Sequence, residues 1–291
     1  MVKGMVSIIV PARTEKFLNR TIEELLEKAT GKIEIIPVLD GYELKDDHYI
    51  DYKMIVDPRV KYLSLPNNGQ RQKRMGINAG VSISKGEYVM WIDAHCAIAK
   101  GFDEVMARDC QDDWIMVPRR YKMNPKTWDR EEWEGRPPID YIYPMLQYLR
   151  KRTRIAGYRW DDRGRERKDI MIDDIIITQG SLIFMSRKWY DKMGFMQVEG
   201  YTGWGQEGEE CCLKTIKEGG RAVVNKNTWY AHLHKGQMHG RMYKWSTVEP
   251  SYKYSFNYWV HENKDFWVDL IEKNRPIPNY KDDWTKIIYG L

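Results

Sequence analysis

EYVMWIDAHC, residues 87–96, is an apolar run that ends in an acidic residue and a histidine. A run of this kind is typical of a strand that is buried on both faces of a parallel sheet. Two similar runs precede it, VSIIVPA at residues 6–12 and IEIIPVLDG at residues 33–41. We therefore predict that the chain opens with a parallel sheet.

Helical patterns separate these strands. Apolar residues recur at helical spacing after the first strand, at Leu18, Ile22, Leu25, Leu26 and Ala29. A third strand, VKYLSL at residues 60–65, is followed by a helix from about Gln70 to Ser84. Such alternation predicts an α/β fold with a mostly parallel sheet flanked by helices. Ligands bind at the carboxyl ends of these strands, where Asp40 and Asp93 stand.

The alternation is interrupted between residues 119 and 172. Within this stretch, residues 150–168 hold nine Lys and Arg against three Asp and Glu. The regular pattern resumes at residues 170–187, with a helix near Trp189, another helix within 203–220 and a last strand in 221–236. We interpret 1–240 as one domain that carries a basic insert at 119–172, which can bind an anionic partner or form a solvated face.

Residues 241–291 are predicted to be an aromatic C-terminal extension packed on that domain. Its aromatic residues alternate as they would on one face of a strand, at Tyr252, Tyr254, Phe256 and Tyr258.

Composition excludes several classes of protein. With 42% hydrophobic residues and 12 Trp, the chain is not disordered. No window approaches the roughly 20 apolar residues of a membrane span, and the N-terminus lacks a signal-peptide layout. The four cysteines show no disulfide spacing. These features predict reduced thiols, a cytoplasmic location and no membrane partner.

Asp93 and His95 form a candidate metal motif at the end of the strand at 87–96. Residues two apart in extended chain point to the same side, so both can bind one cation. A carboxylate, an imidazole and diphosphate oxygens suit Mn²⁺ or Mg²⁺. On spacing alone, a turn cap beside a packed histidine is the alternative.

The motifs around this pair resemble the nucleotide-sugar half of family-2 glycosyltransferases, especially in NNGQRQKRMGINAGVSISKGEYVMWIDAHC, residues 67–96. DAHC resembles the Asp-X-His motif of polypeptide N-acetylgalactosaminyltransferases. GSLIFMSRKWYDKMGF (180–195), GWGQEGEECCLKTIKEGG (203–220) and TWYAHLHKG (228–236) follow the order of that family's motifs. The resemblance covers residues 5–236 without the insert. It implies a GT-A (Rossmann-like) fold, a UDP-sugar donor and Mn²⁺.

The resemblance also implies roles for individual residues. Asp93 and His95 match the metal pair, and His232 matches the third metal ligand. Asp40 matches the acidic residue that holds the uridine, with a turn cap as the alternative. Nucleotide or sugar contacts are predicted for six further residues, Pro11, Arg13, Arg71, Arg74, His234 and Lys235. A surface role is the alternative for the arginines, and a solvated loop is the alternative for His234 and Lys235.

Glu207 lies in Trp204-Gly-Gln-Glu, where related enzymes place an acidic residue beside the acceptor or the sugar. We predict a catalytic role for Glu207 together with Asp93, and stacking of Trp204 on a sugar ring or a core role for it. Inverting family-2 enzymes usually have Glu-Asp here, with the Asp as general base. Gly208 stands in that Asp position, which favours retention. Inversion with a base displaced to Glu209 or Glu210 stays open.

The resulting prediction is a metal-dependent glycosyltransferase that moves a HexNAc or hexose from a UDP-sugar to an intracellular acceptor hydroxyl. One acceptor hypothesis is a hydroxymethylpyrimidine in DNA, such as a virus modifies, bound through the 150–168 segment and its aromatic neighbours. Glycan, lipid-linked and protein acceptors are alternatives, as is an inverting family-2 enzyme acting on a glycan. A non-catalytic module that binds nucleotide sugars or nucleic acid is a rival from another class.

Overall fold

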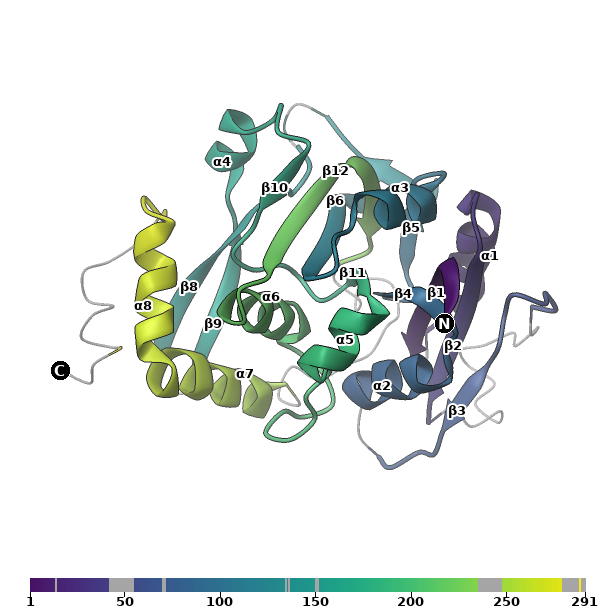
Figure 1. Cartoon of the computed structure of the whole chain (residues 1–291), viewed down its shortest axis with the longest axis horizontal. Helices are drawn as coiled ribbons and strands as arrows, with labels where there is room; N and C mark the ends of the chain where they lie inside the picture. Colours follow the sequence, from purple (N-terminus) through teal and green to yellow (C-terminus); the bar gives the residue numbers. More distant parts are fainter. Residues whose placement is uncertain are drawn as a thin grey trace.

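The computed structural model describes residues 1–13, 15–41, 55–69, 72–133, 135, 137–149, 152–234, 248–278 and 288. A single sheet runs through the molecule in the order β10-β12-β6-β11-β4-β1-β2-β3 (Figure 1). Its strands are β1 Val2–Ala12, β2 Ile33–Asp40, β3 Leu63–Leu65, β4 Gly86–Ile92, β6 Trp114–Asn124, β10 Ile172–Asp174, β11 Leu182–Ser186 and β12 Arg221–His232. Two short strands, β5 Cys96–Ile98 and β7 Asp129–Glu131, pair with β12 and β6.

The strands β4, β1, β2 and β3 are parallel to one another, and β12 is parallel to β6. Strand β11 lies antiparallel between β4 and β6. The predicted mostly parallel sheet is therefore confirmed, with one antiparallel strand at its centre. The carboxyl ends of β1, β2 and β4 meet at one edge, together with the start of β11 and the end of β12.

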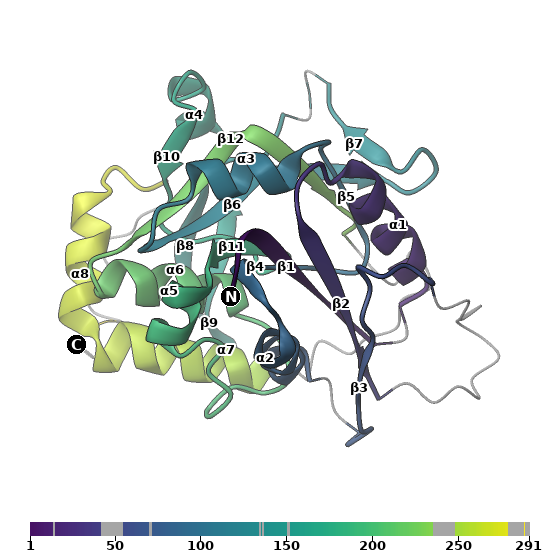
Figure 2. The same ribbon diagram turned by 45° about the vertical axis from the view of Figure 1, so that its right-hand side comes forward.

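Helices cover both faces of the sheet (Figures 1 and 2). Helices α1 Leu18–Lys28 and α3 Phe102–Asp109 pack on one face, and α2 Lys73–Ile83, α5 Arg187–Met193 and α6 Glu207–Lys217 pack on the other. Ile8 belongs to the first core and Ile9 to the second, because alternate residues of a strand point to opposite faces. Burial on both faces explains why these strands are continuously apolar. Helix α3 and strand β6 were not predicted from the sequence.

The predicted insert begins inside the main sheet, because β6 continues to Asn124. The chain then forms β7, a hairpin of β8 Ile142–Leu149 with β9 Arg152–Arg159, and the short helix α4 Asp161–Glu166 before it returns at β10. Three described arginines of the basic run contact acids, in the pairs Arg159–Asp161, Arg165–Asp162 and Arg167–Asp173. Trp128 and Trp160 are buried, whereas Trp133 and Tyr158 are exposed.

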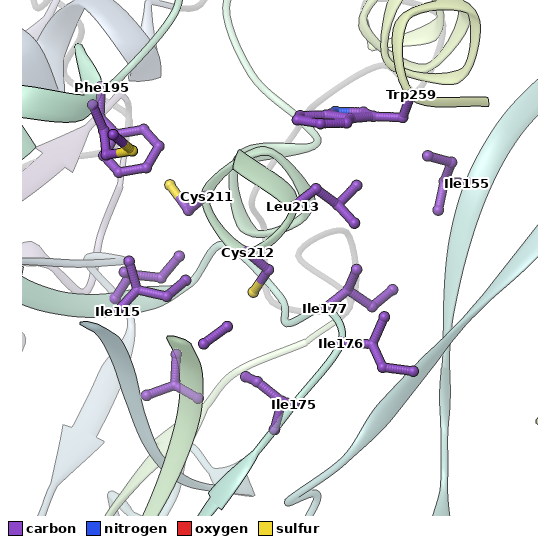
Figure 3. Packing of buried hydrophobic residues seen from close by; sticks show 14 of the residues in the cluster. Ile115, Ile155, Ile175, Ile176, Ile177, Phe195, Cys211, Cys212, Leu213 and Trp259 are labelled. Carbon is purple, nitrogen blue, oxygen red and sulfur yellow. The ribbon is translucent and has the colours of Figure 1, made fainter. Parts of the chain in front are cut away.

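The C-terminal segment is helical, so the predicted strand is wrong. It forms α7 Glu249–Phe256, a π-helical turn at Asn257–Glu262 and α8 Lys264–Lys273. Phe256, Trp259 and Val260 are buried at helical spacing, as are Trp267, Leu270 and Ile271. The alternation of aromatic residues concealed this longer period. Trp259 packs over Leu213 of α6 (Figure 3). Leu213 in turn lies over Ile176 and Ile177, so α6 is enclosed between these residues and the C-terminal helices.

Within the described residues, no helix combines the length and the apolar composition needed to cross a membrane. All four cysteines are buried and carry free thiols.

Candidate metal centre

Asp93, His95 and His232 converge at the carboxyl edge of the sheet. Each offers one ligand atom, and these atoms all lie within 4.8 Å of one another. Asp93 Oδ2 is 3.3 Å from His232 Nε2 and 3.8 Å from His95 Nε2, and the two Nε2 atoms are 2.9 Å apart. This arrangement can hold a divalent cation, because three ligand atoms lie close enough together to bind one ion and leave other coordination positions for substrate oxygens.

Pairing between β5 and β12 brings the two histidines together. In this antiparallel pair His232 is opposite Cys96, and Leu233 donates its N–H to the carbonyl of His95 at 3.2 Å. Asp93 directly follows strand β4 and approaches the histidines from the other side. The N–H of Asp93 donates to Ser181 O at 2.8 Å. The backbone of three strands thus sets the separation of the three ligands.

A carboxylate and a third imidazole lie behind the two histidine rings. His95 Nδ1 lies 3.0 Å from Glu15 Oε2 without hydrogen-bond geometry, and His232 Nδ1 lies 3.4 Å from His234 Nε2. A carboxylate behind the outer nitrogen is the usual partner of a metal-binding histidine, because it orients the ring and raises its basicity. Glu15 was not predicted, because its position just before α1 gives no sign of this contact.

The protonation states at this centre suit a cation. Burial alone would raise the pKa of Asp93, but the Lys73 ammonium and the two histidines outweigh burial and lower that pKa well below its ordinary value. Burial lowers the pKa of His232 to about 3. At neutral pH the centre therefore presents a carboxylate and a neutral His232, which are the forms that bind metals.

Lys73 is a second residue that the sequence analysis missed. Its Nζ donates to Asp93 Oδ1 at 2.7 Å and to Gly180 O at 3.0 Å. Lys73 begins α2, and the first turn of this helix faces the carboxyl edge of the sheet. A basic residue in that turn was the available signal.

Asp40 lies at the end of β2, on the far side of β1 from the metal centre. Its buried carboxylate accepts hydrogen bonds from Gln72 N at 2.8 Å and Gln72 Nε2 at 3.0 Å, and from Arg13 Nη1 at 3.2 Å. Pro11 is within β1, opposite Val38. The structure thus brings Pro11, Arg13 and Asp40 together, with Gln72 as an unpredicted partner.

Arg74 does not face a nucleotide site, and this corrects the prediction. Its side chain is 1% exposed and forms an ion pair with Glu210, which is equally buried. It also donates to Gln197 O at 3.0 Å and Gly205 O at 2.8 Å. Because acceptors within the core surround it, this guanidinium connects α2 to α6. The predicted Arg71 and Lys235 lie outside the described residues.

Glu207 begins α6 and is buried beside the metal centre. Its Oε1 accepts a hydrogen bond from Gly205 N at 2.6 Å. Burial lowers the pKa of Lys73, but the charges of Asp93 and Glu207 outweigh burial and raise that pKa. Trp204 lies in the preceding loop and is partly buried.

Gly208 lies against the backbone of residues 178–180. A Cβ atom there would lie 2.1 Å from Thr178 O, so the position cannot carry any side chain without movement of this backbone. An Asp side chain is therefore sterically excluded at this position.

Comparisons with known proteins agree with this arrangement. The profile of the family "Glycosyl transferase family 2" matches residues 7–197. Glycosyltransferase GlyG of Streptococcus pneumoniae is 30% identical over 109 residues, which are 37% of this chain and 36% of that protein. The putative polypeptide N-acetylgalactosaminyltransferase 13 of Drosophila melanogaster is 24% identical over 255 residues, which are 78% of this chain and 41% of the relative. The chain thus spans less than half of these relatives' length.

A solved structure shares the fold. The crystal structure of GalNAc-T7 with UDP, GalNAc and Mn2+ superimposes with a TM-score of 0.66 at 18% identity. The match covers 98% of this chain and 54% of GalNAc-T7. The predicted GT-A fold and the resemblance to both enzyme groups are confirmed.

Proposed function

The chain belongs to glycosyl transferase family 2, and on this premise we propose that it is a metal-dependent glycosyltransferase that uses a UDP-sugar. The proposal rests on one observation, the convergence of Asp93, His95 and His232 at the carboxyl edge of a GT-A sheet. The structure of GalNAc-T7, which has the same fold, contains UDP and Mn2+. Mn²⁺ or Mg²⁺ fits the three donors found here.

The residues around the centre have separate tasks in this proposal. When bound, the cation supplies Lewis-acid stabilisation of the departing diphosphate. Lys73 holds Asp93 ionised and oriented through its 2.7 Å contact. Asp40, with Arg13 and Pro11, lies at the ends of β1 and β2, where the uridine binds in our proposal. His234 adds a neutral ring behind His232, since burial lowers its pKa to about 2.

Glu207 orients the sugar or the acceptor, and Trp204 in the loop before it stacks on a sugar ring. The closed position at Gly208 supports retention, because the Asp that deprotonates the acceptor in inverting relatives has no room there. Glu210 is not a replacement base, since it is paired with Arg74. Glu209 stays a candidate base for inversion, with burial raising its pKa to about 7. The anomeric configuration of the product, read by NMR, distinguishes the two outcomes.

DNA as the acceptor and a cytoplasmic location stay predictions. Pairing of Arg159, Arg165 and Arg167 with acids reduces the positive charge that the described part of the basic run offers to phosphates. Salt-sensitive affinity for single-stranded or duplex DNA would support this acceptor.

The test of the proposed function is release of UDP from a panel of UDP-HexNAc and UDP-hexose donors with Mn²⁺. We expect turnover or slow donor hydrolysis that requires the metal and is abolished in Asp93→Ala. Asp112→Ala is the matched control, because Asp112 is exposed and its ion pair among the described residues is with the exposed Lys188. If the protein binds UDP-sugars but turns over none of the donors in the panel, the result would instead support a non-catalytic binding module.

A further inference from the structure

Arg120 on β6 is a buried cation, and the residue is 8% exposed. Among the residues that the structure describes, no carboxylate forms an ion pair with it. Its Nη1 contacts Gln179 Oε1, and the Tyr230 hydroxyl is its other polar neighbour. Both partners are neutral, whereas a guanidinium carries five N–H donors and a permanent charge.

The adjacent Arg119, on the same strand, has a carboxylate as its counterion. It points to the opposite face and makes two hydrogen bonds to Asp140, at 2.8 and 2.7 Å. Burial of an unpaired charge costs several kcal/mol in proteins. Burial lowers the pKa of Arg120; the Tyr230 hydroxyl opposes this effect, and the charge of Arg159 adds to it. The fold therefore retains a charge that destabilises it, which is typical of a residue kept for a ligand.

The position of Arg120 relates it to the metal centre. Tyr230 is opposite Arg120 in the β6–β12 pair, and His232 follows two residues later on the same face. The segment 179–181 separates Arg120 from Lys73: Gln179 contacts Arg120, whereas Gly180 O accepts from Lys73. The charge of Arg120 also contributes to the lowered pKa values of His232 and His234, for which burial is the largest cause.

The residues proposed to bind the nucleotide lie on the other side of the metal centre from Arg120. Asp40 and Arg13 lie at β2 and β1, whereas Arg120 lies on β6, beyond β4 and β11 in the sheet order. A donor that occupies the metal centre from the β1 side leaves the β6 side for the acceptor.

We propose that Arg120 binds an oxyanion, a phosphate or a carboxylate, carried by the acceptor, and so selects anionic acceptors. This inference rests on the proposed function for the assignment of the donor side. The planar fork of the guanidinium matches both oxyanions through paired N–H bonds. Binding would also supply the missing counterion.

The test measures thermal stabilisation and calorimetric affinity with sulfate, as a phosphate analogue, and with acetate, as a carboxylate analogue. The full chain is first saturated with UDP and Mg²⁺, so that the donor's own phosphate sites are filled. We expect sulfate or acetate to bind this complex, and Arg120→Gln to weaken the binding at least tenfold, as loss of a charged hydrogen bond does. Arg120→Lys keeps the charge and should retain part of the affinity. Lys122→Gln, an exposed position on the same strand that is paired with Glu131, is the control and should bind normally.

Three results would overturn the proposal. Equal anion binding by wild type and Arg120→Gln, or none by either, removes the site. If Arg120→Gln has weaker affinity for UDP and unchanged anion binding, Arg120 binds the diphosphate of the donor and not the acceptor. A clear loss of thermal stability in both Arg120→Gln and Arg120→Lys without added anion shows a structural role, whereas we expect Arg120→Gln to be at least as stable as wild type. If UDP itself fails to bind, the proposed function fails, and anion binding at Arg120 is still measurable on the free protein.

Discussion

The buried pair between Arg74 and Glu210 provides the sharpest test of the packing around the site. Both side chains are 1% exposed. In Arg74→Met, Glu210 keeps Gln197 N, at 3.0 Å, as a hydrogen-bond donor but loses its counterion. Breaking a buried pair in this way costs about 3–5 kcal/mol. The carbonyls of Gln197 and Gly205 also lose their donor, which places the expected loss towards the upper end.

Urea unfolding followed by circular dichroism measures this loss. We expect the double variant Arg74→Met/Glu210→Met to be more stable than either single variant, because neither charge is then left alone in the core. Arg165→Met is the control, since its pair with Asp162 is exposed and should contribute less than about 1 kcal/mol. The folded fraction of Arg74→Met should bind UDP as wild type does. A small loss of stability combined with a large loss of UDP affinity would refute the structural role and restore the nucleotide role.

Three further perturbations test the site. Glu15→Gln should weaken Mn²⁺ binding by about 10–100-fold in calorimetry, because it removes the carboxylate behind His95; unchanged affinity would contradict this orientation. Between pH 4.5 and about 7 the native state keeps the proton on Glu209 that the unfolded state loses, so this residue makes stability fall as pH rises, by up to about 3 kcal/mol. Urea unfolding at several pH values should show a flatter profile in Glu209→Gln. Gly208→Ala should cost about 3 kcal/mol in the same assay through its contact with Thr178 O, whereas Gly164→Ala on open α4, the control, should be neutral or stabilising.

Local sequence patterns were sufficient for β1, β2 and β4 and for two of the three residues of the candidate metal centre. β1, β2 and β4 are buried on both faces, so their runs are apolar throughout and easily identified. Asp93 and His95 are two residues apart, so their proximity follows from the chain itself. The C-terminal helices were missed because aromatic residues at every second position suggested a strand, whereas the residues that are buried follow a helical period.

The remaining site residues were decided by tertiary structure. His232 is 137 residues from His95 in sequence, and only the register of β12 against β5 brings their rings to 2.9 Å. Before the resemblance to known enzymes was considered, nothing near His232 marked it as a ligand. Lys73 and Arg74 are neighbours on α2, and the sequence alone does not distinguish them. The helix directs Lys73 to Asp93 at the sheet edge and Arg74 to Glu210 in the core, because consecutive residues of a helix point about 100° apart.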